Sequence, residues 1–491
     1  MTRRPATDPA DDPGAAASAA GDGRAGGGDR VERVERVDTI VVADTVLTME
    51  PGAEPLTDGA ISVAGDRIVA VGRAAELRAA SPSARVVGGT GLMALPGLVN
   101  AHQHLTGDRI IRSMIPDDLE PGRSIFEWAV PAHAAHTGDD DELSATLSLV
   151  ESVCNGVTFT VEAGTVAHPD RVLAGFDAVG VGGTLGSWGW DVDGQPWAGS
   201  VDEVLGRQLE VRRLTTDHPR VTGWVTLVGH DLMSDELAVV ASDLARDAGC
   251  GLTFHLSPSD SDTASYLRRT GRRPVAHLDD IGVLGPHVLL GHAVHLADDE
   301  VDTLVRTDTA IAYCPWAYLR LGQGVTRAGR HVEFIGRGGR VALGCDAENA
   351  GDAIDVLGAA ALAAGLAKDM AMDPTSFGAH DALHHATLGA ARALGMDDEI
   401  GSLRPGKRAD IVLVDTTGPE WVPLSPDPVL QLVWASDGRS VAHVMSSGRM
   451  VVEDGEPTGV DRPALAVEAA ERHRRLVHDA GLGGSRSRRS D

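Results

Sequence analysis

Two histidines separated by one residue are the first feature of this chain that suggests chemistry. A mostly apolar run that starts at Leu95 leads into His102 and His104. In an extended strand, residues two apart point to the same face, so both imidazoles can point at one atom. Imidazoles placed in this way are ligands for zinc and related transition metals.

Two later runs add further ligand types. Residues 251–255 have the pattern of a buried strand that ends at His255, and residues 341–346 end at Asp346. Three imidazole nitrogens and one carboxylate oxygen suit zinc, with ferrous iron as the alternative, and leave a position for water. Water on such a cation loses a proton near neutral pH, at a pKa of about 7. These residues therefore predict a metal-bound hydroxide that acts as a nucleophile.

A fourth histidine has a different predicted role. His292 ends the apolar run 288–292, and we expect it to lie beside the hydroxide, where it orients the nucleophile or polarises the carbon under attack. Asp346 has a second predicted task, because a carboxylate beside the attacking water can accept its proton. His292 and Asp346 are therefore predicted to be catalytic.

These residues need a scaffold that brings distant strand ends together. Over residues 96–398, extended apolar runs alternate with helical stretches, as in the βα units of a parallel sheet. Eight parallel strands close into a (β/α)8 barrel, and barrel enzymes carry their chemistry at the carboxyl ends of the strands. We predict eight strands, which end near His104, Glu162, Trp188, His230, His255, His292, Cys314 and Asp346.

The segments on either side of the barrel predict a smaller second domain. Short strands separated by turns fill residues 37–95 and again residues 399–457, and the two groups are expected to complete one β-sandwich. Residues 1–36 are rich in Ala, Gly, Asp and Arg and predict a disordered tail. Residues 458–491 predict a C-terminal helix and tail.

Composition limits the partners. The formal charge of −28 argues against nucleic acid or an anionic membrane as a partner, so we expect a small-molecule substrate. The four cysteines are scattered, and the N-terminal segment lacks the apolar core of a signal peptide, which favours the cytoplasm. The apolar stretch 356–367 is too short to span a bilayer and predicts a buried helix.

The sequence resembles the amidohydrolase superfamily, in particular its mononuclear branch of adenosine-type, guanine-type and triazine deaminases and chlorohydrolases. The resemblance runs from about Asp38 to Glu453. It rests on four motifs: LPGLVNAHQH (95–104), GHAVHL (291–296), LGCD (343–346) and GSLRPGKRADIV (401–412). It implies a homo-oligomer, a dimer or larger. It also implies one bound metal ion with the ligands His102, His104, His255 and Asp346, catalysis by His292, and substrate contact by His230.

One position departs from that resemblance. In the deaminases of this branch, a glutamate three residues after the strand-five histidine transfers a proton to the ring, but this chain has Pro258 there. Proline has no side-chain acid or base, and losing one costs about 100- to 10,000-fold where the chemistry needs it. Either another group supplies the proton or the reaction differs from ring deamination. The candidates for a replacement are Glu348, which we predict to be catalytic, and Glu162, Ser257 and Asp260.

Two predicted loops carry candidate substrate contacts. The long loop after the first barrel strand includes Trp128, and the segment after the seventh includes Trp316 and Arg320. Loops after barrel strands cover the site, so these side chains are predicted to face a planar or anionic substrate.

The sequence as a whole predicts a metal-dependent hydrolase that cleaves a non-peptide carbon–nitrogen bond of a small cyclic compound, by deamination or by cyclic amide or amidine hydrolysis. One alternative is an amide or amidine hydrolase for a larger specialised metabolite, such as a modified peptide. A further alternative is a non-catalytic assembly protein with this fold. Pro258 favours that last alternative, and the complete set of ligands opposes it.

Overall fold

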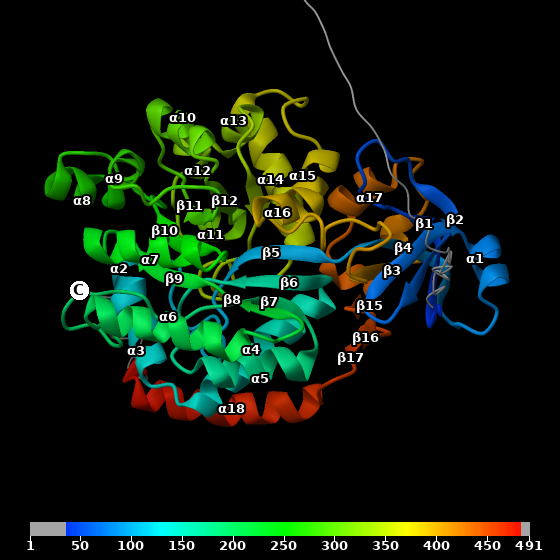
Figure 1. The fold of residues 1–491 in the computed structure, drawn as a ribbon, viewed down its shortest axis with the longest axis horizontal. Coiled ribbons are helices and arrows are strands. Elements are labelled where there is room, and N and C mark those ends of the chain that lie inside the picture. The colour runs from blue at the N-terminus through cyan, green and yellow to red at the C-terminus, as the bar shows by residue number, and fades with distance from the viewer. Residues whose placement is uncertain (1–35, 483–491) are drawn as a thin grey trace, which may run out of the picture. The chain divides into compact units, whose positions relative to one another are not determined.

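The computed structural model describes residues 36–482 and contains a parallel barrel and a mixed sheet (Figure 1). The predicted disordered tail lies outside the described residues except for Arg36, as does the end of the predicted C-terminal tail, residues 483–491. No helix within residues 36–482 is both long and apolar enough to cross a membrane.

The predicted barrel is confirmed. Its strands form two parallel sheets, with the orders β5-β6-β7-β8 and β13-β12-β11-β10-β9. The backbone amides of Cys345 and Asp346, directly beyond β13, donate to the carbonyl oxygen of His102 on β5 and so join the two sheets. The strands are β5 (Leu98–Gln103), β6 (Val157–Glu162), β7 (Gly182–Leu185), β8 (Val221–Gly223), β9 (Val225–Gly229), β10 (Leu252–Leu256), β11 (Val288–His292), β12 (Ala310–Tyr313) and β13 (Val341–Leu343).

Three strands differ from the prediction, and one of them, β13, ends at Leu343, three residues before Asp346. The fourth predicted strand is interrupted at Trp224 and forms the short pair β8 and β9. The third, β7, ends at Leu185, three residues before Trp188. Beyond it, Gly186 and Gly189 lie so close to Thr226 that a Cβ on either glycine would clash with that residue. The absence of a Cβ at both positions allows the chain beyond β7 to approach Thr226 this closely.

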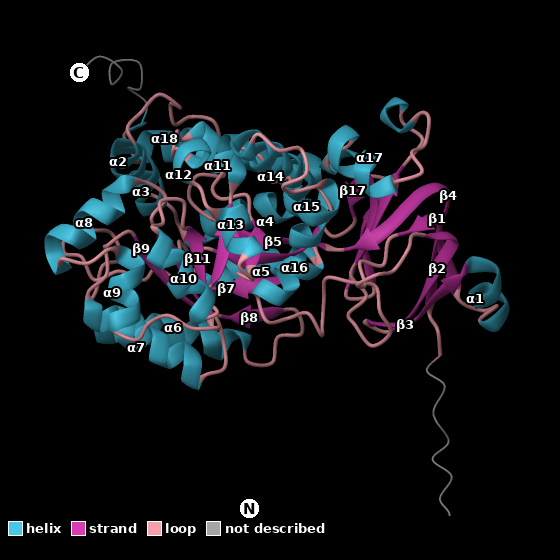
Figure 2. Ribbon diagram, turned by 90° about the horizontal axis from the view of Figure 1, so that it is seen from above, coloured by secondary structure: helices cyan, strands magenta, loops and turns pink. Residues whose placement is uncertain are grey.

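The segments that flank the barrel pair in one eight-stranded mixed sheet, as the sequence predicts. Its order is β17-β16-β15-β14-β4-β1-β2-β3, so β14 from the C-terminal group pairs antiparallel with β4 from the N-terminal group. Figure 2 shows this sheet beside the barrel. The strands are β1 (Thr39–Val46), β2 (Leu56–Ala64), β3 (Arg67–Arg73), β4 (Arg85–Pro96), β14 (Ile411–Asp415), β15 (Val441–Ser446), β16 (Arg449–Glu453) and β17 (Glu456–Pro457).

Helices surround the barrel and cover its ends. The predicted buried helix forms α14 (Val356–Ala371), and its small alanine side chains pack closely against the strands. The other helices between barrel strands and after them are α4 (Gly138–Cys154), α5 (Pro169–Val179), α6 (Val201–Thr215), α7 (Asp235–Asp247), α9 (Pro274–Asp280), α10 (Asp298–Arg306), α13 (His331–Gly336), α15 (Ala379–Ala386) and α16 (Leu388–Ala393). Short helices in the connections are α2 (Pro121–Ser124), α3 (Val130–Ala134), α8 (Asp260–Thr270), α11 (Pro315–Arg320) and α12 (Val325–Ala328). Helices α1 (Ala74–Ala80) and α17 (Pro428–Ala435) accompany the mixed sheet.

The C-terminal helix α18 (Arg462–Asp479) packs beside α4 and the loop that follows β5 (Figure 1). Leu476 on α18 shares an apolar cluster with Ile111 and Trp128 from that loop. The His473 ring nitrogen Nδ1 also lies 2.8 Å from the carbonyl oxygen of Ile110. The helix thereby holds the loop after β5, which carries His104 at its start.

Candidate active site

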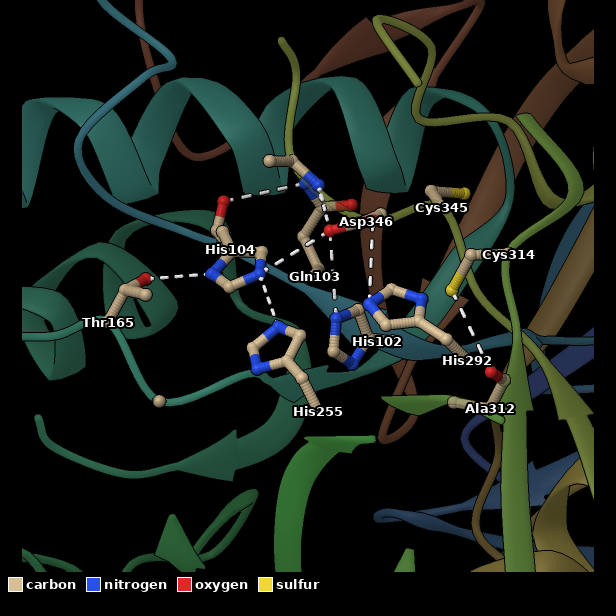
Figure 3. Close-up of polar contacts among 12 residues, drawn as sticks. His102, Gln103, His104, Thr165, His255, His292, Ala312, Cys314, Cys345 and Asp346 are labelled. Carbon is tan, nitrogen blue, oxygen red and sulfur yellow. Dashed lines mark hydrogen bonds and ion pairs between the residues drawn. The ribbon is translucent and has the colours of Figure 1, made fainter. Parts of the chain in front are cut away.

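Five of the predicted side chains meet at the carboxyl end of the barrel (Figure 3). His102 lies on β5 and His104 directly after it, His255 lies on β10, His292 ends β11, and Asp346 follows β13. Nε2 of His104 lies 3.1 Å from Nε2 of His255, and Asp346 Oδ1 lies 3.4 Å from His104 Nε2 and 3.6 Å from His102 Nε2. Asp346 Oδ2 lies 4.0 Å from His292 Nε2. All five residues are at most 9 % exposed.

The donor atoms fit a divalent metal. Each of two triads, His102–His104–His255 and His102–His292–Asp346, offers ligand atoms within 4.8 Å of one another. Neither ring nitrogen of His102 has a hydrogen-bond partner among residues 36–482, although both are buried. A buried polar atom without a partner is costly, and a metal ion relieves that cost at Nε2. Nitrogen and carboxylate oxygen donors of this kind suit zinc.

Burial sets the charge state of the site. It lowers the pKa of His102, and it lowers the pKa of His255 well below its usual value, so both imidazoles are neutral at neutral pH. Burial raises the pKa of Asp346, but the neighbouring His102 and His104 outweigh this effect and hold the pKa well below its usual range. For His104, burial is outweighed by the Asp346 carboxylate, which raises the pKa. Neutral imidazoles and an ionised carboxylate are the forms that bind a metal ion, and these shifts favour them at His102, His255 and Asp346.

Two glycines make room for His102. A Cβ on Gly291 would lie 2.9 Å from the His102 ring, and a Cβ on Gly344 would lie 2.9 Å from the Cβ of His102. Both glycines therefore allow neighbouring strands to approach this imidazole more closely than any other residue would.

Neighbouring groups orient the imidazoles. Nδ1 of His255 lies 2.6 Å from the carbonyl oxygen of Val228, and Nδ1 of His104 lies 3.0 Å from Oγ1 of Thr165. Glu162 accepts hydrogen bonds from the backbone amides of Gly164 and Thr165 and so holds the Thr165 turn. These contacts direct Nε2 of both histidines into the site, as second partners of metal ligands commonly do.

His230 lies against the site. Its ring stacks on His255 with centroids 5.0 Å apart, and its Nδ1 lies 3.3 Å from Oδ2 of Asp262. The same Asp262 oxygen accepts a hydrogen bond from the backbone amide of Ser257. Pro258, in the turn between them, is buried. Asp262 is a carboxylate that the sequence analysis missed, because it is four residues beyond Pro258 and only the first turn of α8 brings it back to His230.

The other predicted acids have partners of their own. Glu348 is buried, and its Oε1 accepts a hydrogen bond of 2.5 Å from Ser148 on α4. Burial and the nearby Asp108 raise the pKa of Glu348 to about 7. Asp260 is highly exposed and pairs with His295. As proton donors to a substrate, these residues stay predictions.

The predicted substrate contacts lie in three different surroundings. Trp128 is 1 % exposed and belongs to the apolar cluster beneath α18. Trp316 packs against α14, where a Cβ on Gly358 would lie 3.3 Å from its indole. Arg320 donates to the carbonyl oxygens of Asn349 and Ile115 and so ties the loop after β13 to the loop after β5. As contacts to a substrate, these three residues stay predictions.

An aromatic cluster that the sequence analysis missed follows β7. Trp188 stacks with Trp190 and Trp197 at centroid distances of 5.1 and 5.0 Å, and the ring of His133 meets Trp188 edge-on at 5.2 Å. His133 in turn covers Gly107, three residues after His104, so closely that a Cβ there would clash with the imidazole. Three tryptophans within ten residues after a barrel strand were the available sequence signal.

The comparisons with known proteins agree with this geometry. The profile of the Amidohydrolase family matches residues 93–451, and that of the bacterial imidazolonepropionase-like composite domain matches residues 59–84. A 5-methylthioadenosine/S-adenosylhomocysteine deaminase of Syntrophobacter fumaroxidans is 31 % identical over 419 residues, which cover 85 % of this chain and 94 % of that protein.

Two solved structures share the fold. An adenosine deaminase from Xanthomonas campestris with bound zinc is 28 % identical, with a TM-score of 0.85, and the match covers 90 % of this chain and 98 % of that one. An atrazine chlorohydrolase from Arthrobacter aurescens, complexed with zinc, is 24 % identical, with a TM-score of 0.79 and coverage of 89 % and 100 %. This chain belongs to the Amidohydrolase family and is a metal-dependent hydrolase that cleaves carbon–nitrogen bonds of small cyclic compounds.

Proposed function

We propose that this hydrolase removes an amino group from a purine-like ring, so that the ring carbon gains a hydroxyl from water and the amino group leaves as ammonia. The observation that carries this proposal is the meeting of three imidazoles and a carboxylate beside a further imidazole at the carboxyl end of the barrel. The deaminase names of the 31 % identical relative and the 28 % identical structure support a purine-like ring.

In this proposal His102, His104, His255 and Asp346 hold one zinc ion. When bound, the metal supplies Lewis acidity and lowers the pKa of water. Asp346 takes a proton at Oδ2, because its Oδ1 already faces His102 and His104 and accepts from the backbone amide of Ala347. From Oδ2 the proton passes toward the departing nitrogen.

His292 polarises the reacting carbon in this proposal. Burial lowers the pKa of His292 to about 3, so the imidazole is neutral and offers one N–H donor. Its Nε2 lies 4.0 Å from Asp346 Oδ2, so that one substrate atom beside the two groups can contact both. His230 binds the ring at the side of His255, oriented by Asp262.

Pro258 favours a second candidate function. Hydrolysis of a cyclic amide or amidine needs ring protonation less than deamination does. Asp346 can take the proton of the attacking water and His292 can polarise the carbon under attack, without a proton on a ring nitrogen. The substrate would then gain one water and release no ammonia. A larger substrate such as a modified peptide belongs to the same candidate.

The test is turnover by the zinc-loaded protein with adenine nucleosides, guanine, triazines, cyclic amidines and cyclic amides. Ammonia release with the matching hydroxyl product supports deamination, and a gain of one water without ammonia supports the second candidate. Asp346→Asn is the inactive control. No turnover in the panel, together with no zinc retained after loading and dialysis, would favour a non-catalytic assembly protein.

A Pro258→Glu variant separates the two candidates further. If ring deamination is the native reaction and already has its proton donor, the added carboxylate changes the rate little. If the native substrate is an amide or amidine, the variant gains deaminase activity and loses the native one.

We also propose that the protein is a cytoplasmic homo-oligomer, a dimer or larger. The four cysteines without disulfide partners in the described chain support a reducing compartment. Light scattering on the purified chain tests the oligomeric state, and a monomer at micromolar concentration would contradict it.

A further inference from the structure

The backbone of His292 has an unusual conformation. Its φ is +76°, and Ala293 follows with φ +48°, both in the left-handed region that residues with a Cβ rarely adopt. Such conformations persist where surrounding groups hold them, and they cluster at functional sites. The conformation turns the chain sharply where β11 ends and thereby sets the direction of the His292 ring.

Backbone hydrogen bonds from Ala293 and Val294 to Leu256 and Ser257 hold this turn, and a side chain holds the carbonyl oxygen of His292. Nε2 of His331, the first residue of α13, lies 2.7 Å from the carbonyl oxygen of His292. The Tyr318 hydroxyl lies farther from the same oxygen, at 3.4 Å, and also at 3.3 Å from the carbonyl oxygen of Ala312. A hydroxyl has one hydrogen to share between these two acceptors, so His331 makes the stronger bond.

His331 is itself held in place. Its ring stacks on Tyr313 with centroids 4.1 Å apart and an interplanar angle of 11°, and it is 4 % exposed. A carbonyl oxygen only accepts hydrogen bonds, so the proton of His331 is on Nε2. Burial lowers the pKa of His331 to about 4, which keeps the ring neutral at neutral pH.

We propose that His331 is a positioning residue, whose N–H bond to the His292 carbonyl fixes the His292 imidazole against Asp346 for the reaction. The inference rests on the role that the proposed function gives His292. It adds a residue that lies 39 positions after His292 in the sequence, on helix α13, which carries none of the five central residues.

Two variants of similar size test the bond. In His331→Gln, the side-chain amide reaches the former place of Nε2 and can still donate, whereas the shorter side chain in His331→Asn reaches only the place of Nδ1. We expect His331→Asn to lower kcat by about 10- to 100-fold, the usual cost of losing an outer partner of a site residue, with KM and zinc content unchanged. We expect His331→Gln to stay within about threefold of the parent. Equal rates in both variants, whether high or low, would overturn the proposal.

A spectroscopic measurement is independent of turnover, and its first readout, the tautomer of His331, needs only the zinc-loaded parent. Nitrogen-15 labelling of the histidines reports the tautomer of each ring. We expect His331 as the Nε2–H tautomer with a slowly exchanging proton, and a shift of the His292 ring signals in His331→Asn but not in His331→Gln. An Nδ1–H tautomer, or unmoved His292 signals in His331→Asn, would refute the positioning role. If the spectra agree and no substrate turns over, the proposed function fails and the structural role of His331 stands.

Discussion

Nε2 of His104 lies 3.1 Å from Nε2 of His255. The carbonyl oxygen of Val228 accepts from Nδ1 of His255, so Nε2 of that ring has no hydrogen and directs a lone pair at His104. The Thr165 hydroxyl lies beside Nδ1 of His104 and can accept its hydrogen. Nε2 of His104 then also carries a lone pair that points at His255. When both Nε2 atoms carry lone pairs, these repel one another at this distance, and a cation that binds both nitrogens removes the repulsion. Metal binding therefore favours the tautomer of His104 with its hydrogen on Nδ1 and stabilises the site.

Removing the metal should therefore destabilise the protein. We expect a chelator to lower the midpoint of thermal unfolding and zinc to restore it. The free energy of unfolding should rise by about 2.7 kcal/mol when free zinc is 100 times its Kd. His255→Ala should bind less zinc by elemental analysis, whereas His295→Ala should bind as much as the parent. Full zinc content in His255→Ala would remove His255 from the ligand set.

Loss of the carboxylate at Asp346 should stop turnover on every substrate. Asp346→Asn keeps the size of the side chain but cannot take a proton, so we expect kcat to fall by at least about 100-fold. Rates are to be measured with zinc content matched to the parent. Asp398→Asn, at a carboxylate whose side chain is 98 % exposed, is the matched control and should retain its activity. Full activity in Asp346→Asn would refute the mechanism.

The Thr165 hydroxyl should matter for zinc affinity. In Thr165→Val, Nδ1 of His104 loses its partner, and we expect the Kd for zinc to rise by about 10- to 100-fold. Competition with a fluorescent chelator measures this change. Thr216→Val, at an exposed threonine, serves as the control. An unchanged Kd would mean that the ring of His104 is oriented by packing alone.

His331 should make the fold sensitive to acid. Its folded pKa is about 4, below the usual 6.5, so its contribution is complete above pH 6.5 and is lost as the pH falls toward 4. A gap of that size corresponds to about 3 kcal/mol over the window. Between pH 7 and pH 4.5, His331→Gln should therefore lose roughly 2 kcal/mol less stability in urea than the parent. Equal losses in both proteins would show that His331 is not buried as a neutral ring.

Asp140 should anchor the C-terminal helix. Burial raises its pKa, but hydrogen bonds from Arg475, Thr137 and Arg472 outweigh burial and hold the pKa well below its usual value. Asp140→Asn should cost about 3 kcal/mol, as loss of one partner of a buried ion pair does, and should expose α18 to protease. The difference from the parent should shrink below about pH 4, where Asp140 takes up a proton in the unfolded chain, and vanish only as the pH falls through the lower folded pKa.

The control for Asp140 is Glu468→Gln. Glu468 is half-exposed and pairs with Arg472, so its loss should cost less than about 1 kcal/mol. Equal losses of stability in the two variants would show that the ion pairs of Asp140 contribute no more than a surface ion pair does.

The sequence was informative wherever local periodicity decides direction. Residues two apart on a strand share a face, and apolar runs that end in His or Asp place those residues at one end of a parallel barrel. That is why the meeting of His102, His104, His255 and Asp346 at one place could be predicted from the chain alone. The same reasoning predicted the barrel and the sheet built from both flanking segments.

Only the tertiary structure decided which partner each side chain has. Thr165 meets His104 across 61 residues and His331 meets His292 across 39, and no local pattern encodes such pairs. Both Arg320 and Trp128 lie in segments that follow barrel strands, where substrate contacts were predicted. Arg320 instead ties two loops together, and Trp128 fills an apolar cluster. The physical reason is that strand periodicity sets the direction of a side chain within its own element, whereas contacts between loops depend on how whole elements pack.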